Sequence, residues 1–366
     1  MALFTPLRVG NITLQHRVAL APLTRFRATQ KEHVPTDIVP TYYAQRAAAP
    51  GTLLITEATF IASQAGGYDY VPGIWNEDQI KGWSKVTAAV HEKKSFIFVQ
   101  LWALGRAADP KILAENNHPY VSASATQLGD KEPTRELTKE EIKEYVELYA
   151  QAAENAVMAG FDGVEIHGAN GYLIDQFLQT NSNHRTDEYG GSITNRTRFA
   201  LEVVRAVSSR IGAAKTSIRL SPWSKFQGMK MPDPIPTFSS LISSLATDFP
   251  DLAYIHLTEP RVDGGNDKAP GDVNEQETND VFRKIWAPRP FLNAGGHTRE
   301  SALKDAEKYP SDVIVFGRHF ISNPDLVDRL RVDAPLTPYD RATFYKPGSP
   351  DGYIDYPTYT EVKARA

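Results

Sequence analysis

The alternation of short apolar runs with amphipathic stretches constrains the fold of this chain more than any other feature. Eight runs are predicted strands: Arg17–Pro22, Thr52–Glu57, Phe96–Trp102, Gly163–His167, Ser217–Pro222, Ala253–Thr258, Phe291–Ala294 and Asp312–Phe316. Predicted helices between or after them include Asn76–Lys94, Thr138–Gly160, Asn195–Ile211 and Asn323–Arg331. Strand–helix alternation is typical of a parallel sheet, and eight units favour a closed barrel. We expect an α/β protein: a (β/α)8 TIM barrel with an N-terminal cap, forming a single domain over residues 1–366.

Three long segments without periodicity follow predicted strands. They are Ala103–Leu137, Ser224–Thr237 and Arg261–Glu277. Loops of this length in a compact domain are usually functional. Because they follow the carboxyl ends of strands, where barrel enzymes build their sites, we expect the functional site at that end of the barrel.

Composition and charge exclude several classes of protein. The formal net charge is −4 and no basic run stands out, so we expect neither nucleic acid nor a membrane as partner. The first ten residues lack the pattern of a signal peptide, and no apolar stretch has the length of a bilayer span. Cysteine is absent, which excludes disulfides and thiolate chemistry. A cytoplasmic protein is expected.

Polar residues occur on predicted strands where a barrel interior normally holds apolar ones. Alternation along the strands places Gln100, Glu165, His167 and Arg219 on inward faces, with Trp102 on the same face as Gln100. A buried, unpaired cation costs several kcal/mol. Glu165, a bound anionic ligand or both together can compensate Arg219, and the pattern favours neither of the two partners.

The segment after the fourth predicted strand continues Gly168-Ala169-Asn170-Gly171-Tyr172. With His167, Asn170 and Tyr172, it offers two hydrogen-bond donors and a phenol in one place. Such groups suit proton transfer beside a developing oxyanion. Taken singly, a buried core histidine and a capping asparagine are the simpler interpretation, but the combination favours a site.

Glycine-containing turns follow the last two predicted strands, at Gly295-Gly296 and Gly317-Arg318. Phosphate sites in barrels often lie in these loops. No G-x-G-x-x-G sequence is present, which disfavours a dinucleotide site of the Rossmann type.

The sequence also bears on three other kinds of site. The nine histidines show no metal-binding spacing, so no metal is expected. No G-x-S-x-G occurs, which disfavours an α/β-hydrolase. Glu57, Glu165 and Glu259 lie near strand ends, an arrangement that suits a barrel glycosidase as the alternative from pattern alone.

Several segments closely resemble Old Yellow Enzymes of the fungal type, in the same order and almost end to end. They include LAPLTR (20–25), VQLW (99–102), the long stretch HGANGYLIDQFLQTNSNHRTDEYGGS (167–192), RLSPW (219–223), FGRHFISNPDL (316–326) and GYIDYPTY (352–359). The H-x-x-N-x-Y stretch followed by R-T-D-E-Y-G-G-S is highly specific. The resemblance implies a (β/α)8 barrel that carries non-covalent FMN over the mouth of the barrel.

The resemblance also implies roles for individual residues. Those that would contact FMN are Pro22, Leu23, Thr24, Ala58, Gln100, Arg219, Gly295, Gly296, Gly317 and Arg318. Within this set Gln100 would bind the pyrimidine edge, Arg219 would lie near N1, and the four residues from Gly295 onward would hold the phosphate. His167 and Asn170 would bind the oxygen of a substrate and Tyr172 would donate a proton. Tyr68, Trp102, Phe226 and Tyr353 would shape the substrate pocket.

The implied activity is reduction of activated carbon–carbon double bonds in unsaturated aldehydes, ketones or nitroalkenes. The reductant would be NADPH in preference to NADH, and the enzyme a monomer or homodimer. A narrow-substrate reductase or isomerase of secondary metabolism is the alternative within the same family. The loop Val262-Asp263-Gly264-Gly265-Asn266 departs from the family pattern, since relatives often carry an aromatic residue there.

Overall fold

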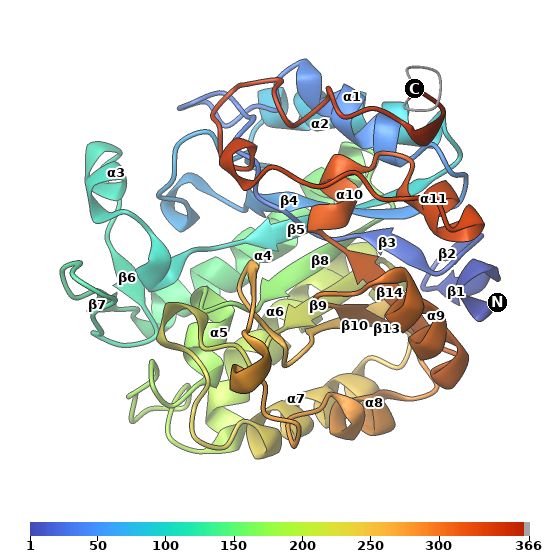
Figure 1. Cartoon of the computed structure of the whole chain (residues 1–366). Coiled ribbons are helices and arrows are strands. Elements are labelled where there is room, and N and C mark those ends of the chain that lie inside the picture. The colour runs from blue at the N-terminus through green and yellow to red at the C-terminus, as the bar shows by residue number, and fades with distance from the viewer. Residues whose placement is uncertain (362–366) are drawn as a thin grey trace.

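The computed structural model describes residues 1–361, and its centre is a closed barrel of eight parallel strands (Figure 1). The barrel strands pair in chain order: β3 (Val18–Leu20), β4 (Leu53–Phe60), β5 (Phe96–Trp102), β8 (Gly163–Gly168), β9 (Thr216–Leu220), β10 (Tyr254–Thr258), β13 (Phe291–Ala294) and β14 (Asp312–Phe316). All eight predicted strands and the TIM-barrel fold are therefore confirmed. The bounds of β5, β13 and β14 are those predicted from the sequence.

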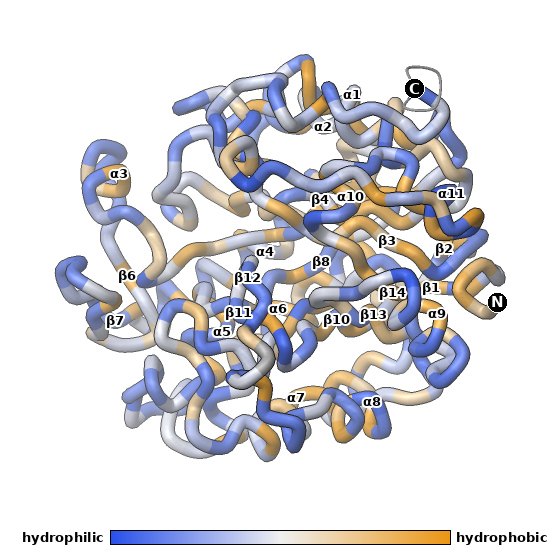
Figure 2. Tube along the Cα trace, viewed as in Figure 1, coloured by the Kyte–Doolittle hydropathy of each residue, from blue (hydrophilic) through white to orange (hydrophobic). Residues whose placement is uncertain are grey.

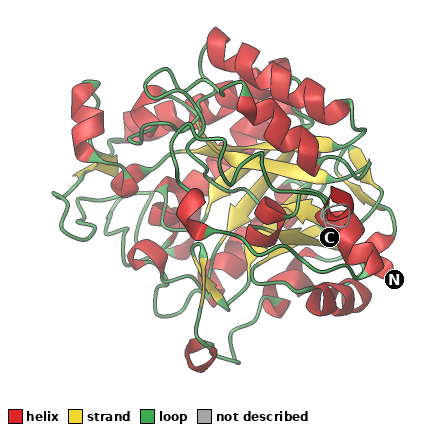
Figure 3. Ribbon diagram, turned by 45° about the horizontal axis from the view of Figure 1, so that its top comes forward, coloured by secondary structure: helices red, strands yellow, loops and turns green. Residues whose placement is uncertain are grey.

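Helices surround the barrel on its outer side (Figure 3). They are α1 (Ile38–Arg46), α2 (Glu77–His91), α4 (Lys139–Met158), α6 (Ile193–Ile211), α7 (Ile235–Asp248), α8 (Asp280–Trp286), α9 (Arg299–Lys308) and α11 (Leu326–Val332), with shorter helices α3 (Pro110–Glu115), α5 (Leu173–Leu178) and α10 (Arg318–Ser322). Helix α4 begins at a capping box in which Thr138 Oγ1 accepts from the Glu141 amide at 3.2 Å. None of the helices within residues 1–361 has the length and apolar character needed to cross a bilayer.

Alternation along the strands separates two apolar clusters. Val164 and Ile166 of β8 and Ile218 of β9 join the cluster that includes the outer helices. Phe98 and Tyr254 belong instead to a smaller cluster inside the barrel. Hydrophobic residues gather along β3 and β14 in Figure 2, whereas the outlying turn near β7 is hydrophilic. The predicted inward faces of the strands are therefore correct.

A hairpin formed by β1 (Leu7–Val9) and β2 (Ile12–Leu14) caps the amino-terminal end of the barrel. Its apolar side chains Val9, Ile12 and Leu14 belong to the inner cluster. The turn of the hairpin is held because the Asn11 amide donates to the carbonyl of Ala214 at 3.2 Å. This closure leaves the opposite, carboxyl end of the barrel open to a ligand.

Two of the long loops contain small sheets of their own. The segment after β5 carries α3 and the pair β6 (Val121–Ser122) and β7 (Arg135–Glu136). The segment after β10 carries the hairpin of β11 (Val262–Asp263) and β12 (Asn266–Asp267). These elements are too short to produce a periodic signal in the sequence, and both lie toward the open end of the barrel.

Buried arginines hold the carboxyl-terminal segment against the barrel. The Arg25 guanidinium donates to the Gly352 carbonyl at 2.8 Å, and Arg27 donates to the Ser349 carbonyl at 2.9 Å. Arg46 donates to the Tyr353 carbonyl at 3.3 Å and to the Phe320 carbonyl of α10 at 3.0 Å. Backbone carbonyls that are buried need such partners, so these arginines fix the course of the segment.

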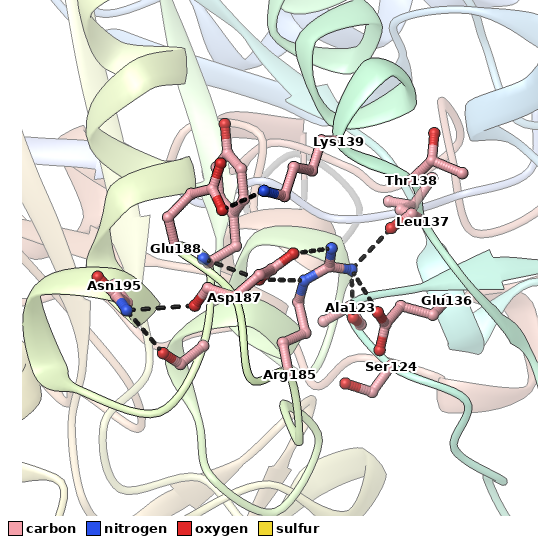
Figure 4. Close-up of polar contacts among 12 residues, drawn as sticks. Ala123, Ser124, Glu136, Leu137, Thr138, Lys139, Arg185, Asp187, Glu188 and Asn195 are labelled. Carbon is pink, nitrogen blue, oxygen red and sulfur yellow. Dashed lines mark hydrogen bonds and ion pairs between the residues drawn. The ribbon is translucent and has the colours of Figure 1, made fainter.

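Arg185 of the R-T-D-E-Y-G-G-S motif connects two loops (Figure 4). Its side chain is 3% exposed and donates to the carbonyls of Ala123 at 3.0 Å and Leu137 at 2.7 Å. The same guanidinium forms a two-point ion pair with Asp187, at 3.0 and 2.6 Å. The motif therefore has a structural function: it ties the loop after β5 to the loop after α5.

We predict that Arg185→Ala lowers the free energy of unfolding by about 3 kcal/mol, because it leaves two carbonyls and a carboxylate without their partner. Urea denaturation at neutral pH measures this difference. Lys139→Ala is the matched control, since Lys139 and Glu188 are each 46% exposed in their ion pair. That variant should lose less than about 1 kcal/mol, and equal losses in the two variants would contradict the prediction.

Candidate active site

A cavity of about 750 Å³ opens at the carboxyl end of the barrel. This volume lies in the range typical of sites for small ligands. The predicted site residues that line the cavity are Pro22, Leu23, Thr24, Ala58, Tyr68, Gln100, Trp102, His167, Asn170, Tyr172, Arg219, Phe226, Gly295, Gly296, Gly317 and Arg318. Closure of the barrel thus gathers residues from four strands and from the segments that follow six strands.

The position of Tyr353 differs from the prediction, because this residue does not line the cavity. Tyr353 is completely buried and stacks on Tyr42, with ring centroids 4.1 Å apart. The guanidinium groups of Arg25 and Arg27 lie over its ring at 5.2 and 5.0 Å. The side chain of Tyr353 therefore packs the carboxyl-terminal segment against α1 and does not face the cavity.

Several residues that line the cavity were missed from the sequence. Tyr339, Arg341 and Tyr345 reach it from the carboxyl-terminal segment, which has no regular secondary-structure pattern. Tyr345 lines the cavity from this segment, whereas Tyr353 does not. Thr258 also lines the cavity, and its place as the last residue of β10 was a signal that could have identified it.

Arg219 is the buried cation of the site. Its side chain lines the cavity, and its Nε atom is buried without a hydrogen-bond partner among the described residues. Burial lowers the pKa of Arg219, and the negative charge of Glu165 opposes that shift. No ion pair within residues 1–361 joins the two side chains directly. The guanidinium is therefore left to interact with an anionic or carbonyl-rich ligand.

Glu165 has other partners below the cavity. Its oxygens accept from Gln100 Nε2 at 2.7 Å and from the Tyr254 hydroxyl at 3.1 Å, and contact His256 Nδ1 at 2.8 Å.

Glu57 is also fully buried, and burial raises its pKa to about 7. Neither of these carboxylates lines the cavity, and Glu259 does not line it either. These three glutamates therefore place no pair of carboxylates in the cavity, which removes the support that they gave to a glycosidase.

His167 is held as a neutral donor. Its Nδ1 accepts from the Ala169 amide at 3.4 Å, so the proton of the neutral ring lies on Nε2. Burial and the nearby Arg219 lower the pKa of His167 well below its ordinary value. The imidazole can thus donate a hydrogen bond into the cavity without carrying a charge.

Asn170 and Tyr172 lie beside His167 after β8. Asn170 adopts a left-handed conformation with φ of 58°, and its backbone N–H donates to Ser221 Oγ at 2.7 Å. The ring of Tyr172 packs edge-on against Trp102 at 4.7 Å and against His167 at 4.8 Å. Burial raises the pKa of Tyr172 above its ordinary value, so the phenol keeps its proton.

The other end of the cavity is formed by the glycine turns. Gly295 and Gly296 have φ of 133° and 62°, which favours glycine at both positions. Arg318 lies beside them and donates to Asp267 Oδ1 at 2.5 Å. Exposed backbone and a guanidinium suit a phosphate at this end. Within residues 1–361, no group of three or more His, Asp or Glu side chains is placed to hold a metal ion.

We predict that His167 stays in the neutral Nε2–H form as the pH falls through 6.5, the ordinary pKa of histidine. The reason is that protonation would place a second charge beside Arg219 in a desolvated site. Ring-nitrogen NMR of histidine-labelled protein measures the tautomer, and the spectrum of His167→Gln identifies the resonance. A His167 signal that titrates with a midpoint near 6.5 would contradict this prediction.

Comparisons with known proteins agree with this arrangement. Residues 2–336 match the sequence model of the NADH:flavin oxidoreductase / NADH oxidase family. The NADP-dependent oxidoreductase lnbE of Aspergillus flavus is 53% identical over 97% of this chain and 96% of its own length. The chanoclavine-I aldehyde reductase fgaOx3 of Penicillium roqueforti is 54% identical over 97% of this chain and 95% of its own length.

A solved structure agrees as well. The Old Yellow Enzyme from Pichia sp. AKU4542 superposes with a TM-score of 0.90 at 41% identity, covering 98% of this chain and 95% of that one. The family match spans most of the chain, and the similarity extends over the barrel and its long loops. The chain belongs to the NADH:flavin oxidoreductase / NADH oxidase family, and within it is an oxidoreductase of the Old Yellow Enzyme type.

Proposed function

We propose that this protein is an FMN-dependent reductase of activated carbon–carbon double bonds in unsaturated aldehydes, ketones or nitroalkenes. One observation carries the proposal: the buried Arg219, whose Nε atom has no partner among the described residues, shares a cavity with a neutral imidazole, a side-chain amide and a protonated phenol. The cationic Arg219 suits a flavin ring, which becomes negative when it is reduced. The neutral donors His167 and Asn170 suit the polarised oxygen of a substrate.

The residues of the cavity fit non-covalent FMN. The Nε atom of Arg219 and the Oγ1 atom of Thr258 are buried polar atoms without partners among the described residues. A flavin offers acceptors to such groups, and its phosphate suits Gly296, Gly317 and Arg318 at the far end. When bound, FMN supplies the hydride chemistry that no amino-acid side chain provides.

The residues after β8 act on the substrate. His167 Nε2 and the Asn170 amide donate hydrogen bonds to the carbonyl or nitro oxygen, which draws electron density from the double bond. Tyr172 holds a proton because of its burial and delivers it to the α-carbon. Tyr68, Trp102 and Phe226 form the walls that orient the substrate. A proton donor in this place favours net reduction over isomerisation.

We further propose that residues 1–366 act as one FMN-binding domain and that NADPH is preferred over NADH. The name of the Aspergillus flavus relative, an NADP-dependent oxidoreductase, supports that preference. A narrow-substrate reductase of secondary metabolism is the second candidate. It is supported by the relative named for reducing chanoclavine-I aldehyde.

Purified protein should be yellow or should take up added FMN, and NADPH should bleach it under anaerobic conditions. The colour should return when a cyclic enone or a nitroalkene is added, because both have an oxygen that His167 and Asn170 can polarise. Absorbance spectroscopy follows both half-reactions. Recovery of colour with one aldehyde alone would favour the second candidate, whereas a protein that binds no FMN would refute both.

We predict that Tyr172→Phe slows reoxidation by a cyclic enone by about 10²–10⁴-fold, since proton donation contributes a factor of this size. Reduction by NADPH should keep its rate, because that half-reaction uses no proton from Tyr172. The phenylalanine ring preserves the packing against Trp102 and His167. Stopped-flow absorbance separates the two rates, and an unchanged rate of reoxidation would remove Tyr172 from this role.

A further inference from the structure

The carboxylate of Glu165 lies directly beneath the candidate site. Glu165 is completely buried on β8, where it pairs in register with Gln100 of β5 and with Ser217 of β9. Ser217 in turn pairs with Tyr254 of β10. Because Ser217 is small, the longer side chain of Glu165 reaches past it to groups on β10.

Three groups surround this carboxylate. Oε1 accepts from Gln100 Nε2 at 2.7 Å, and Oε2 accepts from the Tyr254 hydroxyl at 3.1 Å. Oε2 also lies 2.8 Å from His256 Nδ1. Burial by itself raises the pKa of Glu165, but His256, Arg219 and Gln100 lower it below its ordinary value. The carboxylate is therefore ionised and acts as an acceptor.

An ionised carboxylate determines which way the Gln100 amide faces. Glu165 offers no proton, so the amide must turn its NH₂ group toward the carboxylate. The reverse orientation would place the Gln100 carbonyl oxygen against a negative oxygen. The carbonyl oxygen accepts no hydrogen bond from a residue within 1–361, and Gln100 lines the cavity. Gln100 therefore offers an acceptor, rather than a donor, to a ligand.

The charge of Glu165 also acts on Arg219. Arg219 lies two residues along β9 from Ser217, the register partner of Glu165, so the two inward side chains are neighbours on adjacent strands. Among the surrounding groups, Glu165 does most to raise the pKa of Arg219, although the two form no direct ion pair. Within a desolvated cavity, charges interact over longer distances than they do in water. The positive potential that Arg219 creates in the cavity is therefore partly offset from below.

We propose that Glu165 is a positioning residue with two effects on the flavin. It fixes Gln100 as the acceptor for the imide N–H of the pyrimidine ring, and its charge moderates Arg219 and so lowers the reduction potential of the bound flavin. This inference rests on the proposed binding of FMN in the cavity.

Glu165→Gln separates this role from simple packing, because the side chain keeps its size while it loses its charge. The dissociation constant for FMN should rise about three- to tenfold, the loss expected for one hydrogen bond. The reduction potential should become more positive, because Arg219 is no longer offset. Fluorescence titration of the apoprotein measures the first quantity, and equilibration with a reference dye measures the second.

Tyr254→Phe is the matched control, because it removes a hydrogen bond from the same carboxylate but keeps its charge and the Gln100 contact. Both quantities should stay near those of the unaltered protein. In the background of Gln100→Ala, Glu165→Gln should no longer weaken FMN binding but should still raise the potential. Glu165→Asp provides a second test should Glu165→Gln not fold: it keeps the charge and withdraws the acceptor, so affinity should fall and the potential should not rise.

The outcomes distinguish this inference from the proposed function. If the unaltered protein binds no FMN, the proposed function itself is wrong. If it binds FMN but Glu165→Gln leaves both affinity and potential unchanged, only the role of Glu165 is refuted. An equal shift in potential for Tyr254→Phe and Glu165→Gln would also overturn it, because packing rather than charge would then be the cause.

Discussion

Burial of polar groups at one end of a closed barrel is the constraint on which this molecule depends. Eight parallel strands that close in chain order bring all their carboxyl ends to one rim. An inward polar side chain near that rim must find a partner or face a cavity, because burying it alone is costly. Gln100 and Glu165 find partners below the rim, whereas the Arg219 guanidinium faces the cavity and its Nε atom has no partner within residues 1–361.

Several other buried arginines have hydrogen-bond partners for their guanidinium groups. Arg185 donates to two carbonyls and to Asp187, and it binds loops together without reaching the cavity. Arg25 and Arg46 likewise donate to backbone carbonyls of the segments near the carboxyl terminus. The difference between these residues and Arg219 lies in their hydrogen bonds rather than in their burial. Among these arginines, Arg219 is therefore distinguished by an unpaired Nε atom together with a place in the cavity, and not by burial alone.

The carboxyl-terminal segment illustrates how architecture and site depend on each other. It has little regular structure, yet the buried arginines set its course so that Tyr339, Arg341 and Tyr345 reach the cavity. Tyr353 belongs to the same segment, and its buried ring packs against Tyr42. A resemblance in sequence could not distinguish a tyrosine that packs this segment against the barrel from one that lines the cavity.

The sequence by itself determined the barrel, its eight strands, the inward faces of those strands and most of the cavity residues. These features depend on local periodicity and on the rule that parallel strands end on the same side, which residue order alone expresses. Only the tertiary structure showed that Glu165 bonds to Gln100, Tyr254 and His256 and forms no direct ion pair with Arg219. It also decided the place of Tyr353 and the contribution of Tyr345. Such questions depend on distances between residues far apart in the chain, and short irregular segments leave no periodic signal of where they pack.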